Sequence, residues 1–338
     1  MKTNLIQQLP NTELDIIGDI HGEIGALCSL LDRLGYNAKG EHREKRTLVF
    51  VGDLVDRGPN SIAVVDLVKN MFEHGTVRIV AGNHELNILR GKKKHGNHWF
   101  YGQQEKMFSP EDTSDSKLLS HESFSQCITS DAKRQEIVDF FSLLPIALER
   151  EDIRIAHACW HEESIERLRT GEQNIFKRYL QEENTLRQQI STPSKEDVKA
   201  TQLYDLFMQN NNPIKVITSG LEKEALHPFL IGGENRYTER ILWWKTYQGP
   251  PVIFGHYWRR RGNGPFDIRA TPPPYLFESI SEFDWLNQCF CVDYSVGARY
   301  VERATEKPVG AMGAYLCALR THGNHFELLF DDGHTVSL

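Results

Sequence analysis

The amino-acid sequence predicts an α/β fold in which helices flank a mixed β-sheet core. Two observations lead to this prediction. Strand-like and helix-like segments alternate through the first 90 residues, and short apolar segments typical of strands return after residue 250. Alternation of this kind is typical of parallel strands that are joined by right-handed helical crossovers.

The first 90 residues show a βαβαβ pattern. Residues 23–34 carry apolar side chains at the spacing of one helix face. Residues 47–51 form a continuous apolar run, as expected for a strand that is covered on both faces. The other elements expected here are strands at 14–17 and 77–80 and a helix at 61–74.

We expect a single domain that spans residues 1–338, because the sequence shows no internal repeat and no low-complexity tract. Residues 91–135 read as a polar excursion with one or two helices, and residues 161–212 read as a charged helical insertion. Residues 137–150 predict a helix followed by a strand. Later strands are expected at 153–156, 216–218, 252–254, 290–292, 315–319 and 326–330.

Composition excludes several classes of protein. The chain carries a net charge of −7, so we expect no stable nucleic-acid partner. The N-terminus lacks the apolar segment of a signal peptide, and no apolar stretch approaches the roughly 20 residues needed to span a membrane. Six cysteines without a CxxC pair are typical of buried thiols in a reducing compartment. We therefore expect a cytoplasmic protein with no membrane partner.

Polar motifs follow the ends of five predicted strands. Three are short blocks, GDIHG at 18–22, GDLVDRG at 52–58 and GNHE at 82–85. Two are single histidines, His157 and His256, that follow apolar runs. Ligands of open α/β sheets bind beyond the carboxyl ends of the strands, so these motifs are expected to meet.

The side chains in these motifs are the oxygen and imidazole ligands of a dinuclear metal site, which activates water to attack phosphate esters. Asp53 is the candidate bridge, because a carboxylate has two oxygens. The other ligands are assigned as Asp19 and His21 to one ion, and Asn83, His157 and His256 to the other. His161 is a less favoured alternative to His157, because it begins the charged helical segment. Two divalent ions are expected, with Mn²⁺ favoured and Fe, Zn²⁺ and Mg²⁺ as alternatives.

Three further residues suit chemistry on a phosphoryl group. The planar guanidinium of Arg57 matches phosphate oxygens. His84, next to a candidate ligand, is placed to protonate the leaving oxygen as a general acid. Asp56 is placed to orient and charge His84. The sequence thus predicts His84, Asp56 and Arg57 as catalytic residues.

The three blocks, in this order and at these intervals, resemble those of the phosphoprotein phosphatase family within the calcineurin-like metallophosphoesterases. The resemblance implies a β-sandwich flanked by helices, the residue roles given above, and a second phosphate-binding arginine between the last two histidines. Arg236 and Arg240 are both candidates for that arginine. The segment CVDYSVG at 291–297 resembles the bacterial branch, which includes diadenosine tetraphosphatases and small serine/threonine phosphatases.

The resemblance predicts a metal-dependent phosphatase that hydrolyses phosphomonoesters, with a serine/threonine-type protein phosphatase favoured. The alternative is a dinucleoside polyphosphate hydrolase that acts on substrates such as diadenosine tetraphosphate. The expected partner is therefore a phosphorylated protein or a nucleotide polyphosphate. A non-catalytic binding module is the alternative from another class, and the presence of every expected ligand argues against it.

Two features remain open in the sequence. The run at 92–94 (KKK) is either an exposed charge run or a rim that attracts an anionic substrate. Trp243, Trp244, Tyr257 and Trp258 bracket His256, and such aromatic side chains either stack on a nucleobase or fill the core.

Overall fold

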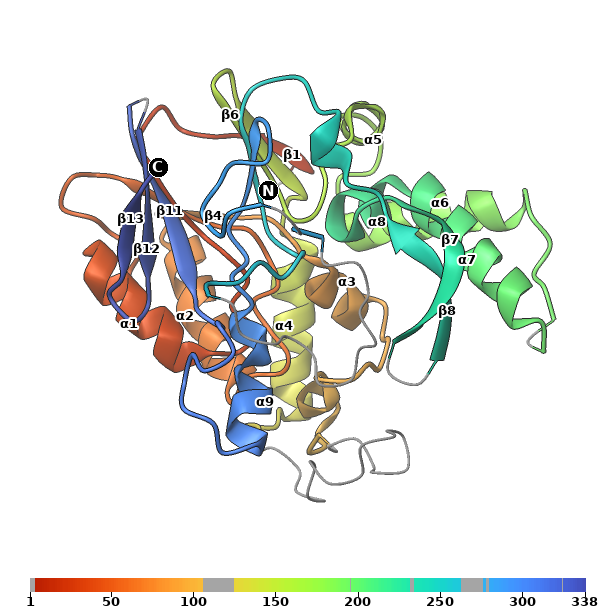
Figure 1. Cartoon of the computed structure of the whole chain (residues 1–338), viewed down its shortest axis with the longest axis horizontal. Helices are drawn as coiled ribbons and strands as arrows, with labels where there is room; N and C mark the ends of the chain where they lie inside the picture. Colours follow the sequence, from red (N-terminus) through yellow and green to blue (C-terminus); the bar gives the residue numbers. More distant parts are fainter. Residues whose placement is uncertain are drawn as a thin grey trace.

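The computed structural model describes residues 4–105, 125–194, 196–231, 234–262, 276–277, 280–323 and 325–338. Two mixed β-sheets pack against each other, and helices cover their outer sides (Figure 1). The predicted α/β architecture, a β-sandwich flanked by helices with an inserted helical segment, is confirmed.

The larger sheet has six strands in the order β13-β12-β11-β2-β3-β4. Strands β2, β3 and β4 run parallel, whereas β11, β12 and β13 are antiparallel to their neighbours. Its strands are β2 (Leu14–Ile17), β3 (Thr47–Phe50), β4 (Val77–Ile79), β11 (Cys317–His322), β12 (His325–Phe330) and β13 (Thr335–Ser337). The parallel part is therefore the βαβαβ unit that the sequence predicts.

The second sheet has five strands in the order β1-β5-β6-β9-β10. Here β6, β9 and β10 run parallel, and β5 pairs antiparallel with β6. Its strands are β1 (Ile6–Gln8), β5 (Ala147–Arg150), β6 (Ile153–Ala156), β9 (Val252–Phe254) and β10 (Cys289–Cys291).

Alternation along the strands divides the core in two. Ile16 and Val49 of the larger sheet pack with Ile253 of the smaller sheet in the layer between the sheets. The next residues along, Ile17 and Phe50, point the other way and pack with the helix layer. These side chains are fully buried, and each such side chain contributes about 1.5–3 kcal/mol to folding. The strand ends that carry the polar motifs are thus fixed by apolar packing on both faces.

Five helices surround the sandwich, and the described chain places a second group of four at one side of the molecule with a hairpin (Figure 1). The first group is α1 (Ile24–Leu34), α2 (Ser61–Glu73), α3 (Asn83–Leu89), α4 (Asp131–Ser142) and α9 (Arg299–Ala304). The second group is α5 (Glu162–Leu168), α6 (Ile175–Arg187), α7 (Val198–Asn211) and α8 (Pro213–Ser219), followed by β7 (Glu222–Ile231) and β8 (Glu234–Arg240). Short 3₁₀ turns occupy His98–Tyr101, Trp243–Lys245 and Val296–Ala298. No helix in the described ranges is long and apolar enough to cross a membrane.

The strand predicted at 216–218 is wrong, because these residues lie in α8. Pro213 stands at the start of this helix, and the Asn212 side chain accepts hydrogen bonds from the first turn. The β-branched side chains Val216, Ile217 and Thr218 are completely buried. Capping and burial therefore outweigh the strand preference of β-branched residues.

Other differences concern short elements. The sequence does not predict β1, β13 or the β7–β8 hairpin, and the strand expected at 315–319 begins two residues later, at Cys317. In the excursion at 91–135, the described residues contain a 3₁₀ turn and the start of α4, and residues 106–124 lie outside the described ranges. Three-residue edge strands carry too little periodicity to be recognised in a sequence.

Candidate active site

The candidate ligands follow the C-terminal ends of five strands from both sheets. Strands β2, β3 and β4 of the larger sheet and β6 and β9 of the smaller sheet lead into them. The ligand candidates that follow these strands in order are Asp19, His21, Asp53, Asn83, His157 and His256. Parallel strands end at the same edge of a sheet, which explains why residues far apart in the chain meet here.

Asp53 lies where two groups of ligands meet. Its Oδ2 is 3.8 Å from His21 Nε2, and its Oδ1 is 3.3 Å from His157 Nε2. Among the described residues, two clusters of potential ligand atoms share Asp53, one with His21 and His84 and one with His157 and His256. A carboxylate common to both clusters fits the bridging position that we infer from the sequence.

Asp19 and Asn83 extend the two clusters. Asp19 Oδ2 is 3.9 Å from His21 Nε2, and Asn83 Oδ1 lies 2.8 Å from His256 Nδ1 and 3.2 Å from His157 Nε2. Asp19 Oδ1 and His256 Nε2 are buried without a hydrogen-bond partner in the described part of the chain. Buried polar atoms are rarely left unpaired, and a cation bound in each cluster would give each of these atoms a partner. The donor set therefore fits divalent metal ions.

Backbone carbonyl groups orient two of the imidazole rings. His21 Nδ1 lies 3.1 Å from the carbonyl oxygen of Val55, and His157 Nδ1 lies 2.8 Å from that of Val51. A ring that donates through Nδ1 keeps its lone pair on Nε2, the atom that faces Asp53 in both cases. This is the arrangement that a histidine metal ligand requires.

Electrostatics favour an ionised Asp53 and neutral rings at His21 and His256. Burial acts to raise the pKa of Asp53, but the positive charges of His157 and His84 outweigh burial and hold it well below its ordinary value. Burial also holds the pKa values of His21 and His256 well below their usual range. These are the states of Asp53, His21 and His256 that bind a cation. His157 differs, because Asp53 and Asp19 outweigh burial and raise its pKa to about 10, so a bound cation would have to displace its proton.

Left-handed backbone accompanies these side chains. Non-glycine residues rarely adopt positive φ, and when they do, they cluster at functional sites. Positive φ angles occur at His21 (48°), Asp53 (49°), Asp56 (78°), Arg57 (66°) and His256 (71°). The buried side chains on both faces of the strands must hold these loops in place.

Two glycines allow the ligand loops to approach each other. A Cβ atom on Gly82 would lie 2.2 Å from Asp53 Oδ1, and one on Gly255 would lie 2.0 Å from Asp19 Oδ1. Neither position has room for any side chain. The glycine next to Asn83 and the glycine next to His256 are thus required by the closeness of the carboxylates.

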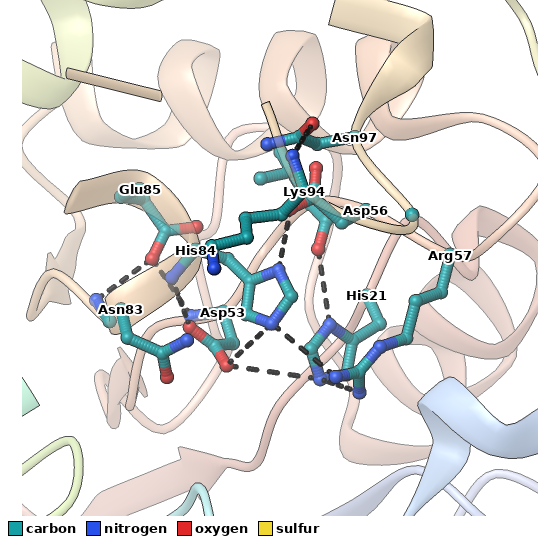
Figure 2. Close-up of polar contacts among 12 residues, drawn as sticks. His21, Asp53, Asp56, Arg57, Asn83, His84, Glu85, Lys94 and Asn97 are labelled. Atoms are coloured by element: carbon teal, nitrogen blue, oxygen red, sulfur yellow. Dashed lines mark hydrogen bonds and ion pairs between the residues drawn. The ribbon is translucent and has the colours of Figure 1, made fainter. Parts of the chain in front are cut away.

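His84 is held by a buried carboxylate. Its Nδ1 lies 2.5 Å from Asp56 Oδ2, and the other oxygen of Asp56 accepts a hydrogen bond of 2.8 Å from Trp99 Nε1. The second ring nitrogen faces Asp53 and Arg57 (Figure 2). Burial acts to lower the pKa of His84, but Asp53 and Asp56 outweigh it and raise the pKa above its ordinary value. A protonated imidazole is the state that a general acid needs.

Arg57 is fixed by an aromatic ring. Its guanidinium carbon lies 4.3 Å from the centroid of the Trp258 ring. The backbone N–H of Trp258 donates 2.8 Å to Asp293 Oδ2, and the N–H of Ser295 donates 2.8 Å to the other oxygen of this buried carboxylate. A Cβ atom on Gly297 would lie 3.1 Å from Arg57 Nη1, so the segment at 291–297 packs directly against the arginine.

The two candidate second arginines are placed differently. Both lie on β8 and pair with Glu222, Arg236 Nη2 at 3.0 Å and Arg240 Nη1 at 3.3 Å. Arg240 is close enough to His256 for its charge, together with burial, to lower the pKa of that histidine. We therefore take Arg240 as the candidate. The structure brings all six predicted ligands together with His84, Asp56 and Arg57, whereas no contact joins Arg236 to them within the described residues.

The aromatic residues around His256 fall into two groups. Trp244 and Tyr257 are 1% and 4% exposed and pack with Phe254 in the core. Trp258 is half-buried and packs on Arg57. The core interpretation therefore holds for Trp244 and Tyr257, and Trp258 is a wall of the site.

The sequence pattern of the family described as calcineurin-like phosphoesterase matches residues 13–256, which span every candidate metal ligand. The chain belongs to this family. Membership shows that the chain has the fold that the sequence motifs imply, in a family described as phosphoesterases.

Curated relatives of this phosphoesterase share a shorter region. The asymmetrical bis(5'-nucleosyl)-tetraphosphatase PrpE of Bacillus subtilis strain 168 is 48% identical over 79 residues, which are 22% of this chain and 32% of the relative. The protein of the same name from Halalkalibacterium halodurans is 45% identical over 93 residues, 25% of this chain and 38% of the relative. The matches thus span about a third of the length of these relatives.

Solved structures similar to this phosphoesterase include a putative diadenosine tetraphosphatase, which is 18% identical with a TM-score of 0.42 and covers 99% of this chain and 97% of that chain. Another is the cold-active protein-tyrosine phosphatase of a psychrophilic Shewanella species, 15% identical with a TM-score of 0.47, covering 100% of this chain and 83% of that chain.

Glu85 ends the block GNHE, and its role is visible in the structure but is not predicted from the sequence. Glu85 is completely buried, and its carboxylate accepts hydrogen bonds from the backbone N–H groups of Asp53 (2.9 Å), Leu54 (2.8 Å) and Gly82 (2.8 Å). It therefore ties the loop of the candidate bridge to the start of α3. A glutamate at the third position of a helix is a recognised capping signal, which could have revealed the bond to Gly82 but not those to Asp53 and Leu54.

Proposed function

We propose that this phosphoesterase hydrolyses a phosphoanhydride bond in a nucleotide polyphosphate, such as a dinucleoside tetraphosphate, at the site around Asp53. The observation that carries the proposal is the pair of ligand clusters that share the Asp53 carboxylate. Metal ions held by these two clusters would withdraw electrons from the phosphoryl group and activate water as the nucleophile.

The residues beside the clusters divide the remaining tasks. Arg57, stacked on Trp258, presents its guanidinium to the phosphoryl oxygens and fixes the reacting group. His84 donates a proton from Nε2 to the leaving oxygen, because its Nδ1 is held by Asp56. Arg240 adds positive charge from the hairpin side of the site.

The choice of substrate is supported by the relatives. The curated proteins that match the region of the three blocks are named as tetraphosphatases. This favours the nucleotide polyphosphate over the phosphorylated protein, which is the substrate that the sequence alone favours.

The test is a panel of three substrates, diadenosine tetraphosphate, a phosphoserine peptide and p-nitrophenyl phosphate, with Mn²⁺ present throughout. We expect the highest kcat/KM on the tetraphosphate, no turnover after chelator treatment, and recovery when Mn²⁺ is returned. Turnover by thoroughly metal-free protein would refute the metal mechanism, and preference for the phosphopeptide would refute the substrate.

A serine/threonine-type protein phosphatase remains the second candidate, because of the short contact between Asp56 and His84. The alkoxide that leaves phosphoserine is a much stronger base than the phosphate that leaves an anhydride, so it depends more on a proton donor. The phosphopeptide in the same panel decides between the two candidates.

A further inference from the structure

The loop that follows α3 forms one wall of the site. The side chain of Asn97, which is completely buried, accepts a hydrogen bond of 2.8 Å from the backbone N–H of Lys94 and donates one of 2.9 Å to the carbonyl of Lys92. The carbonyl of Gly96 accepts a hydrogen bond of 3.0 Å from the backbone N–H of Arg57. The lysine run is therefore fixed directly beside the residue that we assign to phosphate binding.

Two of the three lysines in this run are available to a ligand. Lys94 is exposed, and Figure 2 shows its side chain extending from the Asn97 turn toward His84. Within the described ranges, neither the Lys92 nor the Lys94 ammonium has a hydrogen bond or an ion pair. Lys93 differs, because its ammonium donates a hydrogen bond to the side chain of Gln103.

Positive charge continues from this loop toward the helical insertion. Arg90 follows directly after α3, and its guanidinium carbon lies 4.7 Å from the centroid of the Tyr179 ring. The ammonium of Lys215 lies 5.9 Å from the same centroid. Lys215 pairs with Glu183 at 3.5 Å. Loss of surrounding water, together with the charges of Arg90 and Lys94, lowers the pKa of Lys92. Four cations, Arg90, Lys92, Lys94 and Lys215, lie here with the two acids Glu183 and Asp205, although the whole chain is acidic.

We propose that Lys92 and Lys94 form a second anion subsite that binds the phosphate groups of an oligophosphate chain beyond the phosphoryl group that reacts at Arg57. The subsite deepens the proposed function and rests on it, because a phosphomonoester has no further phosphate to place there. Ammonium groups on flexible side chains act as mobile point charges, which suits phosphates whose positions vary along a chain. The loop thus selects substrates by the number of their phosphates.

The test compares Lys94→Ala and the double variant Lys92→Ala/Lys94→Ala with the matched control Lys93→Ala. Each is measured on diadenosine tetraphosphate and on p-nitrophenyl phosphate. We expect KM for the tetraphosphate to rise roughly fivefold in the single variant and roughly tenfold or more in the double variant, as for exposed charge pairs. KM for p-nitrophenyl phosphate should stay unchanged, and Lys93→Ala should match the wild type on both substrates.

Two further measurements separate the possible failures. Competition by inorganic tripolyphosphate against p-nitrophenyl phosphate should weaken in the double variant, whereas competition by orthophosphate should not. Equal loss on both substrates, or an equal effect of Lys93→Ala, overturns the subsite. If the wild type does not cleave the tetraphosphate, the proposed function fails instead. In that event, an unchanged competition by tripolyphosphate would also refute the subsite, and a weakened one would support it.

Discussion

The two sheets contribute differently to the candidate site. The six-stranded sheet supplies the carboxylates, the arginine and the candidate acid within three short blocks at 18–22, 52–58 and 82–85. The five-stranded sheet supplies two isolated histidines, His157 and His256. In the proposed mechanism, the six-stranded sheet serves both metal binding and phosphoryl chemistry, whereas the five-stranded sheet completes metal binding. Substitutions on the two sides should therefore fail in different ways.

The largest expected effect is that of Asp53→Asn, because Asp53 joins the two sides. An amide lacks the negative charge and the second acceptor oxygen, so we expect loss of both metal ions and activity at background level. His157→Asn is the comparison and should lose ions from one cluster only. Metal content by mass spectrometry checks both variants. Two ions retained at normal affinity in Asp53→Asn would show that the carboxylate is no bridge.

His84→Asn tests whether the first sheet carries chemistry beyond ligation. His84 belongs by distance to one ligand cluster, but its Nδ1 is engaged by Asp56. If His84 is a general acid, the His84→Asn variant should keep both metal ions while its kcat falls roughly 10²–10⁴-fold. The fall should be larger on a phosphoserine peptide than on p-nitrophenyl phosphate, whose leaving group needs no proton. An equal fall in kcat on both substrates, or the loss of a metal ion, would contradict the general-acid role and indicate that His84 is a metal ligand.

The same division explains how much the sequence can predict. Ligands that share a short block with glycines can be recognised, because spacing along a loop fixes their relative positions. The βαβαβ unit is equally clear, because buried parallel strands such as 47–51 are continuous apolar runs. The contact of Trp258 with Arg57 cannot be predicted in this way. It depends on Asp293 in a segment brought near by the fold, and local periodicity holds no information about such pairs.

The hairpin and α8 show the same limit in the fold. The helix at Pro213–Ser219 depends on a cap and on burial beneath neighbouring helices, not on the preference of its β-branched residues. In β7–β8, charged side chains such as Glu222 and Arg240 pair across the hairpin, so the alternation of apolar and polar residues that marks a strand is absent. The sequence therefore reveals the metal ligands better than the elements around them, such as α8 and the β7–β8 hairpin.

Arg57→Ala should separate phosphate binding from metal binding on the first side. A charge-assisted hydrogen bond contributes about 1.5–3 kcal/mol, so KM should rise roughly 10- to 100-fold while both metals remain. Arg57→Lys keeps the charge but loses the planar guanidinium and its stacking on Trp258. Its KM should therefore lie between the values of the wild type and of Arg57→Ala. Steady-state kinetics with metal analysis in parallel provide the check. An unchanged KM would remove Arg57 from the substrate site.

The smallest expected effect concerns the β7–β8 hairpin, where Arg240→Ala and Arg236→Ala form a matched pair. Both residues lie on β8 and share Glu222 as a partner, so simple weakening of the hairpin should affect the two variants alike. Of the two, Arg240 is the arginine whose charge acts to lower the pKa of His256. We expect KM to rise about two- to fivefold in Arg240→Ala, as for a partly exposed charge, and to stay unchanged in Arg236→Ala.

Thermal unfolding of both variants supplies the control for hairpin stability, and Arg240→Lys shows whether charge alone suffices at this position. If Arg240→Ala and Arg236→Ala raise KM equally and unfold at equally lowered temperatures, the effect is structural and Arg240 is not a phosphate contact. If only Arg236→Ala raises KM, the assignment of the two arginines is reversed. A selective effect of Arg240 would mean that the β7–β8 hairpin, which sequence periodicity does not reveal, contributes to substrate binding beside the metal ligands of the two larger sheets.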